Sequence, residues 1–421
     1  MKTRGTYRTQ LRHKGFRRYF VGESVSSVGD SMTDITVVML AISLLTPGNQ
    51  PIGIALATGA YLVPSMVSGL ILARWIGRLG GRTMLLVDSV WRGCLLGVVA
   101  VLAMTSSLDF GLCVGLLALA SVSRPLYSAG ARAIVVELVP TDGLFAANSL
   151  VGVALQAASL IGPVAAGSAI AVLGPASAMG LDALSFLFFA GALLLVPRPT
   201  VRAPFAGQEA GHPTVRSWGI VRLVRIRSVG TLFGLTAVFY LLYGPFVVCL
   251  PLMMAERVHD WSPALTLGLL WAAFGVGALV GGGFAGRFSE LAHVRIAALS
   301  AAGWGVAMLV VALPLNLGIA LAAMFAGGLS YAPYGAIATT VLQRELPPEQ
   351  LNAASSYYGS MTNVAAPAGT FVGGAAAGLF SPATSVLAAG AVLAAVGTVV
   401  FLLGRPHGGR PTRYSVAEGV E

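Results

Sequence analysis

Three acidic residues recur at helical spacing near the start of the chain. Glu23, Asp30 and Asp34 are separated, with Ser27 between them, by steps of four, three and four residues. An α-helix of about 3.6 residues per turn places all of them on one face. Several ionised carboxylates on one stripe are unfavourable in a low-dielectric wall. We therefore expect one of them, Asp34 or Asp30 first, to carry a proton reversibly, although a structural role in a hydrated cavity explains each residue equally well.

Two arginines are candidate partners for these acids. Arg124 lies just before Pro125 within a long apolar stretch, where it could exchange partners with Asp30 or Asp34 as protons come and go. A fixed ion pair is an equal alternative. Asp88 and Arg92 are four residues apart and are expected to pair with each other.

The composition places this chemistry in a membrane. Of 421 residues, 56% are hydrophobic and 10% are charged, whereas a soluble chain carries about 25% charged residues. The net charge of +10 comes from basic residues between apolar stretches, which argues against a nucleic-acid partner. No cofactor or metal framework is expected, because Cys94, Cys113 and Cys249 all lie in apolar runs.

Twelve stretches are long enough to cross a bilayer, since a span needs about 20 apolar residues. Basic residues concentrate in alternate loops, which predicts both termini in the cytoplasm of a multi-pass protein of the bacterial plasma membrane. The expected domains are an N-terminal bundle over 1–196, a central loop over 197–229, a C-terminal bundle over 230–403 and a tail over 404–421. The predicted spans cover 20–45, 52–75, 84–104, 110–136, 145–172, 175–196, 230–254, 263–285, 294–313, 315–342, 351–379 and 383–403.

The two halves of the chain resemble each other. Residues 137–149 match residues 344–356, and Gly162 to Gly167 matches Gly369 to Gly374, both at an offset of 207. An internal repeat of this kind is typical of transporters with a substrate site between two related bundles. We expect an all-α membrane protein made of two pseudo-symmetric six-helix bundles that works by alternating access.

The loop between the second and third spans carries a recognisable motif. Its sequence, from Ala73 to Arg82, is Ala-Arg-Trp-Ile-Gly-Arg-Leu-Gly-Gly-Arg. It resembles the corresponding loop of the major facilitator superfamily, and nearly the whole chain resembles that family's bacterial twelve-helix drug and macrolide efflux group. Arg78, Gly80 and Arg82 are kept, whereas Gly77 replaces an aspartate. The resemblance implies a cytoplasmic gate, in which Asp88 or Glu137 is expected to supply the missing negative charge and Arg92 lies nearby.

A second motif, Gly162-Pro163 followed by Gly167, resembles an element of the family's antiporters. Small residues allow close helix approach and proline allows a kink. The resemblance favours export over import, while plain helix packing explains the glycines equally well.

Aromatic residues are abundant in the second half and could form a pocket for a bulky, lipophilic compound. Fewer than half of them are expected to touch substrate, because aromatic residues in spans mostly pack or face lipid. The candidate lining residues are Tyr240, Tyr243, Phe246, Trp271, Tyr331, Tyr334 and Tyr357.

These patterns predict a proton-coupled secondary transporter that exports a drug, antibiotic or secondary metabolite. Its expected partners are the small-molecule substrate, protons and the bilayer, and it is expected to act as a monomer without a cofactor. Two alternatives stay open. One is a proton-coupled importer of a metabolite or siderophore. The other is a polytopic membrane enzyme that holds magnesium through Asp30 and Asp34, although no second aspartate-rich site accompanies them.

Overall fold

The fold was analysed in a computed structural model of the chain. It describes residues 11–76, 78–140, 143–197, 220–258, 262–285, 294–314, 316–346 and 348–403. Gly77 of the first motif, most of the central loop and the predicted tail 404–421 lie outside these residues.

The described part of the first half contains six helices and a short 3-10 turn, η1 (Pro47–Asn49). The predicted fourth span is interrupted just before Pro125, between Ser121 and Arg124. The predicted fifth and sixth spans form one long helix, the last of these six, with a kink at Gly174, whose φ is +82°. A positive φ favours glycine, because it has no Cβ to clash with the backbone. The helices are α2 (Lys14–Leu44), α3 (Gln50–Ile76), α4 (Gly81–Met104), α5 (Phe110–Ser121), α6 (Arg124–Leu138) and α7 (Leu144–Leu194).

The second half begins with the short α8 and continues with six long helices. These are α8 (Ile220–Val224), α9 (Arg227–Arg257), α10 (Pro263–Ala285), α11 (Val294–Ala312), α12 (Leu317–Glu345), α13 (Pro348–Leu379) and α14 (Pro382–Leu403).

The twelve predicted spans all correspond to helical segments. Ten stretches of the described chain are long and apolar enough to cross a membrane. One of them, Ala146–Leu194, has 49 residues and contains two predicted spans on either side of Gly174. The remaining predicted span is α13, whose first half carries Ser355, Ser356 and Thr362 and is more polar. The all-α membrane fold is therefore confirmed.

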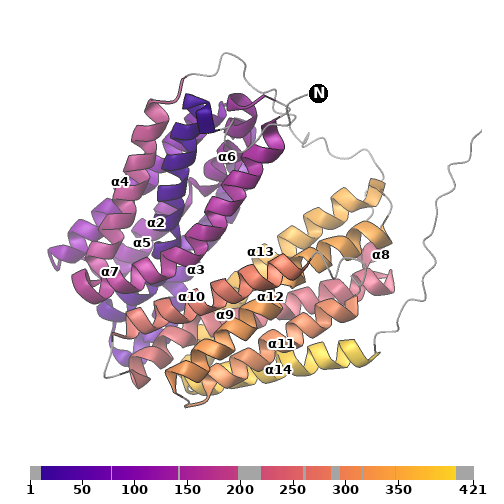
Figure 1. Cartoon of the computed structure of the whole chain (residues 1–421). Coiled ribbons are helices and arrows are strands. Elements are labelled where there is room, and N and C mark those ends of the chain that lie inside the picture. The colour runs from indigo at the N-terminus through magenta and orange to yellow at the C-terminus, as the bar shows by residue number, and fades with distance from the viewer. Residues whose placement is uncertain are drawn as a thin grey trace, which may run out of the picture.

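The helices form two bundles, one from α2 to α7 and one from α9 to α14 (Figure 1). Within the first, α7 packs against α2 and α4; within the second, α10 packs on α12, α11 on α14 and α13 on α9. Large apolar side chains such as Val172, 81% exposed, cover the outside, as expected for a surface in contact with lipid. The bundles meet along two seams, α7 with α10 and α3 with α13.

Both seams lie at one end of the molecule. A Cβ placed on Gly268 would come within 2.5 Å of the Pro163 carbonyl, and one on Gly374 within 2.8 Å of the Pro51 carbonyl, so glycine is what permits this approach. We call this the opposite end, and we call the end at which α2 begins the termini end. Figure 1 shows the two bundles spreading apart toward the termini end.

Candidate functional site

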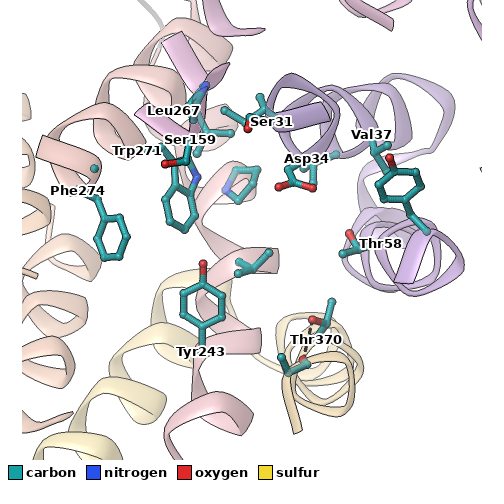
Figure 2. Close-up of a pocket in the computed structure, with 18 of the residues that line it drawn as sticks. Ser31, Asp34, Val37, Thr58, Ser159, Tyr243, Leu267, Trp271, Phe274 and Thr370 are labelled. Atoms are coloured by element: carbon teal, nitrogen blue, oxygen red, sulfur yellow. Dashed lines mark hydrogen bonds between the residues drawn. The ribbon is translucent and has the colours of Figure 1, made fainter. Parts of the chain in front are cut away.

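A central cavity of about 390 Å³ lies between the two bundles. Polar side chains line it from the first half: Ser31 and Asp34 of α2, Thr58 and Tyr61 of α3, and Gln156 and Ser159 of α7. Aromatic side chains line it from the second half: Tyr243 of α9 and Trp271 and Phe274 of α10. The first half thus supplies Asp34 and most of the polar groups, alongside apolar residues such as Val37 and Val38, and the second half supplies an aromatic wall (Figure 2).

Asp34 is the one carboxylate among the described residues that line this cavity. Its side chain is exposed and points toward the space in front of Tyr243 and Trp271 (Figure 2). Within the described part of the chain, no hydrogen bond or ion pair engages it. The cavity therefore contains a single negative charge that the protein leaves without a direct partner.

Asp30, one helical turn before Asp34, has three neighbours that bind or attract its carboxylate. Its Oδ1 lies 2.9 Å from Nη1 of Arg92 and accepts a 3.0 Å hydrogen bond from the Tyr61 hydroxyl. Its Oδ2 lies 3.7 Å from Nη2 of Arg124, a distance at which charges attract without a hydrogen bond. Asp30 therefore has cationic partners, whereas Asp34 makes no ion pair with the described residues.

Arg92 connects Asp30 to a second acid in the interior of the first bundle. Its Nε lies 3.0 Å from both oxygens of Asp88, and its Nη2 lies 2.5 Å from Oδ2. The Ser123 hydroxyl donates a 2.7 Å hydrogen bond to the same carboxylate. The predicted pairing of Asp88 with Arg92 is confirmed, and the guanidinium also covers the ring of Phe186 at 4.1 Å. The bidentate, buried pair of Arg92 with Asp88 lies within α4 and orients the guanidinium, whose contact with Asp30 links that helix to α2.

Arg124, the first residue of α6, is held less tightly. Its guanidinium carbon lies 4.6 Å above the centroid of the Tyr61 ring, and its buried Nη1 makes no hydrogen bond with the described residues. Nη1 of Arg124 is therefore still available to donate a hydrogen bond, whereas Nε, Nη1 and Nη2 of Arg92 all donate to carboxylates.

Glu23 lies apart from the cavity. It is buried, and the Tyr127 hydroxyl donates a hydrogen bond to its Oε1. Its other oxygen, Oε2, has no hydrogen-bond partner among the described residues. Asp182 of α7 is also buried and accepts hydrogen bonds from Thr33 of α2 and from Ser185, so its carboxylate links α7 to α2.

The gate motif is arranged differently from the sequence expectation. Neither Asp88 nor Glu137 forms an ion pair with Arg78 or Arg82 in the described part of the chain. Asp88 is occupied by Arg92, and Glu137 accepts a 2.9 Å hydrogen bond from the Gly81 amide, because the unpaired N–H groups at the start of α4 attract a carboxylate. Gly80 is the N-cap of that helix.

The two motif arginines point elsewhere. Arg82 donates to the carbonyls of Leu193, at 2.8 Å, and Leu194, at 3.2 Å, at the end of α7, where a cation meets the negative end of the helix dipole. Arg78 is exposed. The motif thus ties the start of α4 to the ends of α6 and α7 at the termini end.

The Gly-Pro motif of α7 lies where three surfaces meet. A Cβ on Gly162 would approach Cβ of Ser31 to 2.4 Å, so glycine lets α7 contact α2. Pro163 lines the cavity. A Cβ on Gly167 would approach the Ala264 carbonyl to 2.6 Å, so this residue belongs to the seam with α10.

The predicted aromatic pocket is smaller than the sequence suggests. Of the seven candidates, Tyr243 and Trp271 line the cavity, together with Phe274. Phe246 is buried against Trp304, with ring centroids 5.1 Å apart, and packs behind the wall. The remaining four candidates also lie outside the cavity lining: Tyr240, Tyr331, Tyr334 and Tyr357.

Tyr334 illustrates why periodicity did not identify the wall. Its ring stacks on Phe239 at 4.4 Å, and its hydroxyl lies 2.7 Å from the Thr236 hydroxyl, so both its apolar and its polar parts are satisfied inside the second bundle. Tyr61 was missed for the opposite reason: it is an isolated tyrosine in an apolar span, and only the tertiary fold brings it to Asp30.

The chain matches the family model described as transmembrane secretion effector over residues 6–411. It is 24% identical over 406 residues to an uncharacterized MFS-type transporter, y4rN, of Sinorhizobium fredii, covering 95% of this chain and 98% of that protein.

Solved transporters share the fold at low sequence identity. A bacterial homologue of the human lysosomal transporter Spinster, inward-facing and occupied, has a TM-score of 0.69 at 13% identity, covering 94% of this chain and 96% of that one. A peptide transporter, POT, in complex with alafosfalin has a TM-score of 0.71 at 13% identity, covering 92% and 94%.

Proposed function

Because the chain belongs to the transmembrane secretion effector family of the major facilitator superfamily, and is therefore a multi-pass membrane transporter and not an enzyme, we propose that it exports a small lipophilic compound in exchange for protons. The observation that carries this proposal is the unpaired carboxylate of Asp34 in a cavity with an aromatic opposite wall.

The proton site is Asp34, with Asp30 as its neighbour in the relay. A carboxylate that faces a cavity without a partner can bind either a proton or a cationic group of a substrate, but not both at once. Arg124 has a weak 3.7 Å contact with Asp30 and an unused Nη1, so it can move toward whichever acid is ionised. Protonation of Asp34 would release both the substrate and this arginine, which biases the bundles toward the other state. Glu23 would accept protons at a later step, since it is buried away from the cavity.

The orientation proposed for the chain is compatible with export. Basic loops favour a cytoplasmic termini end in the bacterial plasma membrane, so a cavity closed by seams at the opposite end would load substrate from the cytoplasm. The Gly162-Pro163-Gly167 element, which resembles that of antiporters, supports exchange with protons. The loop from Arg78 to Arg82 would act as the gate at the termini end, together with Glu137. One chain supplies both walls of the cavity, which supports a monomer.

The test measures proton release from acidified inverted vesicles when lipophilic antibiotics and dyes are added outside. Wild type is compared with Asp34→Asn and with Asp109→Asn. Asp109 caps α5 by accepting from the Leu112 amide, and asparagine keeps that cap, so this control changes an acid outside the cavity.

We expect at least one compound to release protons with wild type and with Asp109→Asn but not with Asp34→Asn. An equal response of Asp34→Asn contradicts its role as the carrier. Release only when the compound is loaded inside the vesicles identifies symport and hence an importer. Absence of any response contradicts proton-coupled export of this compound class.

A further inference from the structure

A second hollow, of about 410 Å³, adjoins the central cavity on the α7–α10 side. We call it the lateral groove, and the residues that define it are Gly152, Val153, Gln156, Leu160 and Ile161 of α7 and Leu279 of α10. No charged side chain is among its described lining residues. Its position on a seam between the two bundles distinguishes it from a surface irregularity within one bundle.

The groove and the central cavity share a lining residue. Gln156 lines both of them. Ile161, five residues later on the same helix, lies about 140° further around the axis at 100° per residue and is 53% exposed. The groove therefore extends from the residue that also lines the cavity to an exposed apolar face of α7.

The seam ends where the groove begins. On the side of the opposite end, α7 and α10 touch at Pro163 with Gly268 and at Gly167 with Ala264. Leu160 belongs to the same contact, since a Cβ on Gly275 would lie 2.8 Å from its side chain. Toward the termini end, Val153 is 69% exposed and Leu279 is 42% exposed, so the two helices have separated there.

The groove lies on a stretch of α7 that is long and apolar enough to cross a membrane, Ala146–Leu194. Gly152 is eight residues into α7, which is about 12 Å along the helix axis. An apolar hollow on such a stretch is open to molecules dissolved in lipid.

We propose that the lateral groove is a membrane portal through which a lipophilic amphiphile bearing one amine passes from the bilayer into the central cavity. The uncharged groove suits the apolar body of such a molecule, and Asp34 in the adjoining cavity supplies the counter-charge for its head. Gln156, which lines both hollows, can accept a hydrogen bond from the protonated amine through its Oε1 as the molecule passes from the groove to the cavity. This inference rests on the proposed function, since it concerns the route of the exported compound.

The experiment plugs the groove without disturbing the packing. A Cβ on Gly152 meets nothing within 4 Å, so Gly152→Trp can fill the hollow without a clash. Gly191→Trp is the matched control, because Gly191 is also exposed, lies on α7 and has no neighbour within 4 Å of a Cβ, but lies outside the groove. The full chain is placed in phosphatidylethanolamine and phosphatidylglycerol liposomes with a long-chain alkylammonium ion that carries a mid-chain diazirine, and peptides are mapped after illumination.

We expect the probe to label the cavity wall around Tyr243 and Trp271 in wild type and in Gly191→Trp, and this labelling to be lost in Gly152→Trp. Labelling of the outer lipid-facing surface should stay unchanged in all three proteins, which shows that each one is folded in the bilayer. Equal cavity labelling in Gly152→Trp overturns the portal in favour of entry from water, and absence of cavity labelling in wild type overturns it as well.

A diazirine-bearing phosphatidylcholine distinguishes a portal from a resident lipid site. If this lipid labels the groove and prevents the alkylammonium ion from reaching the cavity, the groove is a lipid site and the proposal fails. Proton release on addition of the same ion, measured in vesicles of the same protein, tests export separately, so a failed portal with intact proton release leaves the proposed function standing.

Discussion

Replacement of Arg92 by methionine should destabilise the protein far more than the same replacement of Arg124. The side chains of Arg92 and Asp88 are 1% and 0% exposed, and Arg92 also bonds to Asp30 at 2.9 Å. Its removal leaves the Asp88 carboxylate buried with only the Ser123 hydroxyl as a donor. Breaking a buried ion pair from one side costs about 3 to 5 kcal/mol of unfolding free energy.

Arg124 provides the internal comparison. Its contact with Asp30 is 3.7 Å long, and the two side chains are 27% and 28% exposed, so its contribution to stability should resemble that of an exposed pair, about 0 to 1 kcal/mol. We therefore expect Arg124→Met to unfold like wild type and to fail in transport, whereas Arg92→Met loses stability first.

Unfolding can be followed with a thiol-reactive fluorogenic dye during titration with a denaturing detergent, because Cys113 and Cys249 are free and buried. The exposed Cys94 is first changed to serine to remove the background. A loss for Arg92→Met no larger than that for Arg124→Met refutes the assignment of Arg92 as the structural arginine. Adding Asp88→Leu to Arg92→Met should restore part of the stability, because an apolar pair can replace a buried ion pair.

Three further outcomes are expected. Tyr61→Phe keeps the ring but removes the 3.0 Å hydrogen bond to the charged Asp30, a bond worth about 1.5 to 3 kcal/mol, so substrate-driven proton release should fall. Thr58→Val, one turn away in the same cavity, should release protons like wild type. Equal proton release by the two variants contradicts the role of the Tyr61 hydroxyl. Gly244→Ala should lower the free energy of unfolding, since its Cβ would come within 2.0 Å of the α13 backbone. Gly234→Ala, whose Cβ would have no neighbour within 4 Å, should raise that free energy by about 0.5 to 1 kcal/mol. The reverse order of stability contradicts the packing of α9 on α13. Glu137→Ala should cost about 0.3 to 1 kcal/mol through loss of the charge at the start of α4, measured by the same dye assay, with Glu137→Gln losing less because its amide oxygen still accepts.

The spans could be predicted from the sequence because the bilayer imposes a length and an apolarity on each of them. Gly174 and Pro175 likewise mark the break in α7, since neither continues a regular helix well. The pairing of Asp88 with Arg92 is local in sequence and follows from helix geometry. These features depend on one helix at a time.

The rest of the site depends on how helices face one another. Arg92 and Asp30 are 62 positions apart, and no local sequence pattern indicates that Arg92 forms ion pairs with both Asp88 and Asp30. For the same reason the sequence could not tell Tyr243, on the cavity wall, from Phe246, three residues later and buried behind it. A carboxylate near a helix start can also bind amides in place of arginines, which is why Glu137 contacts the Gly81 amide.

The ion pairs described above, which join Asp30, Asp88, Arg92 and Arg124, lie within the first bundle. The aromatic wall around Trp271 belongs to the second. A mutation that reshapes the aromatic wall therefore leaves the ionic network untouched. Over evolutionary time the second half is free to diverge toward new cargo while the first half keeps the network to which we attribute proton coupling. If that proposal holds, a chimera that joins the first half of this chain to the second half of a relative should take its specificity from the relative.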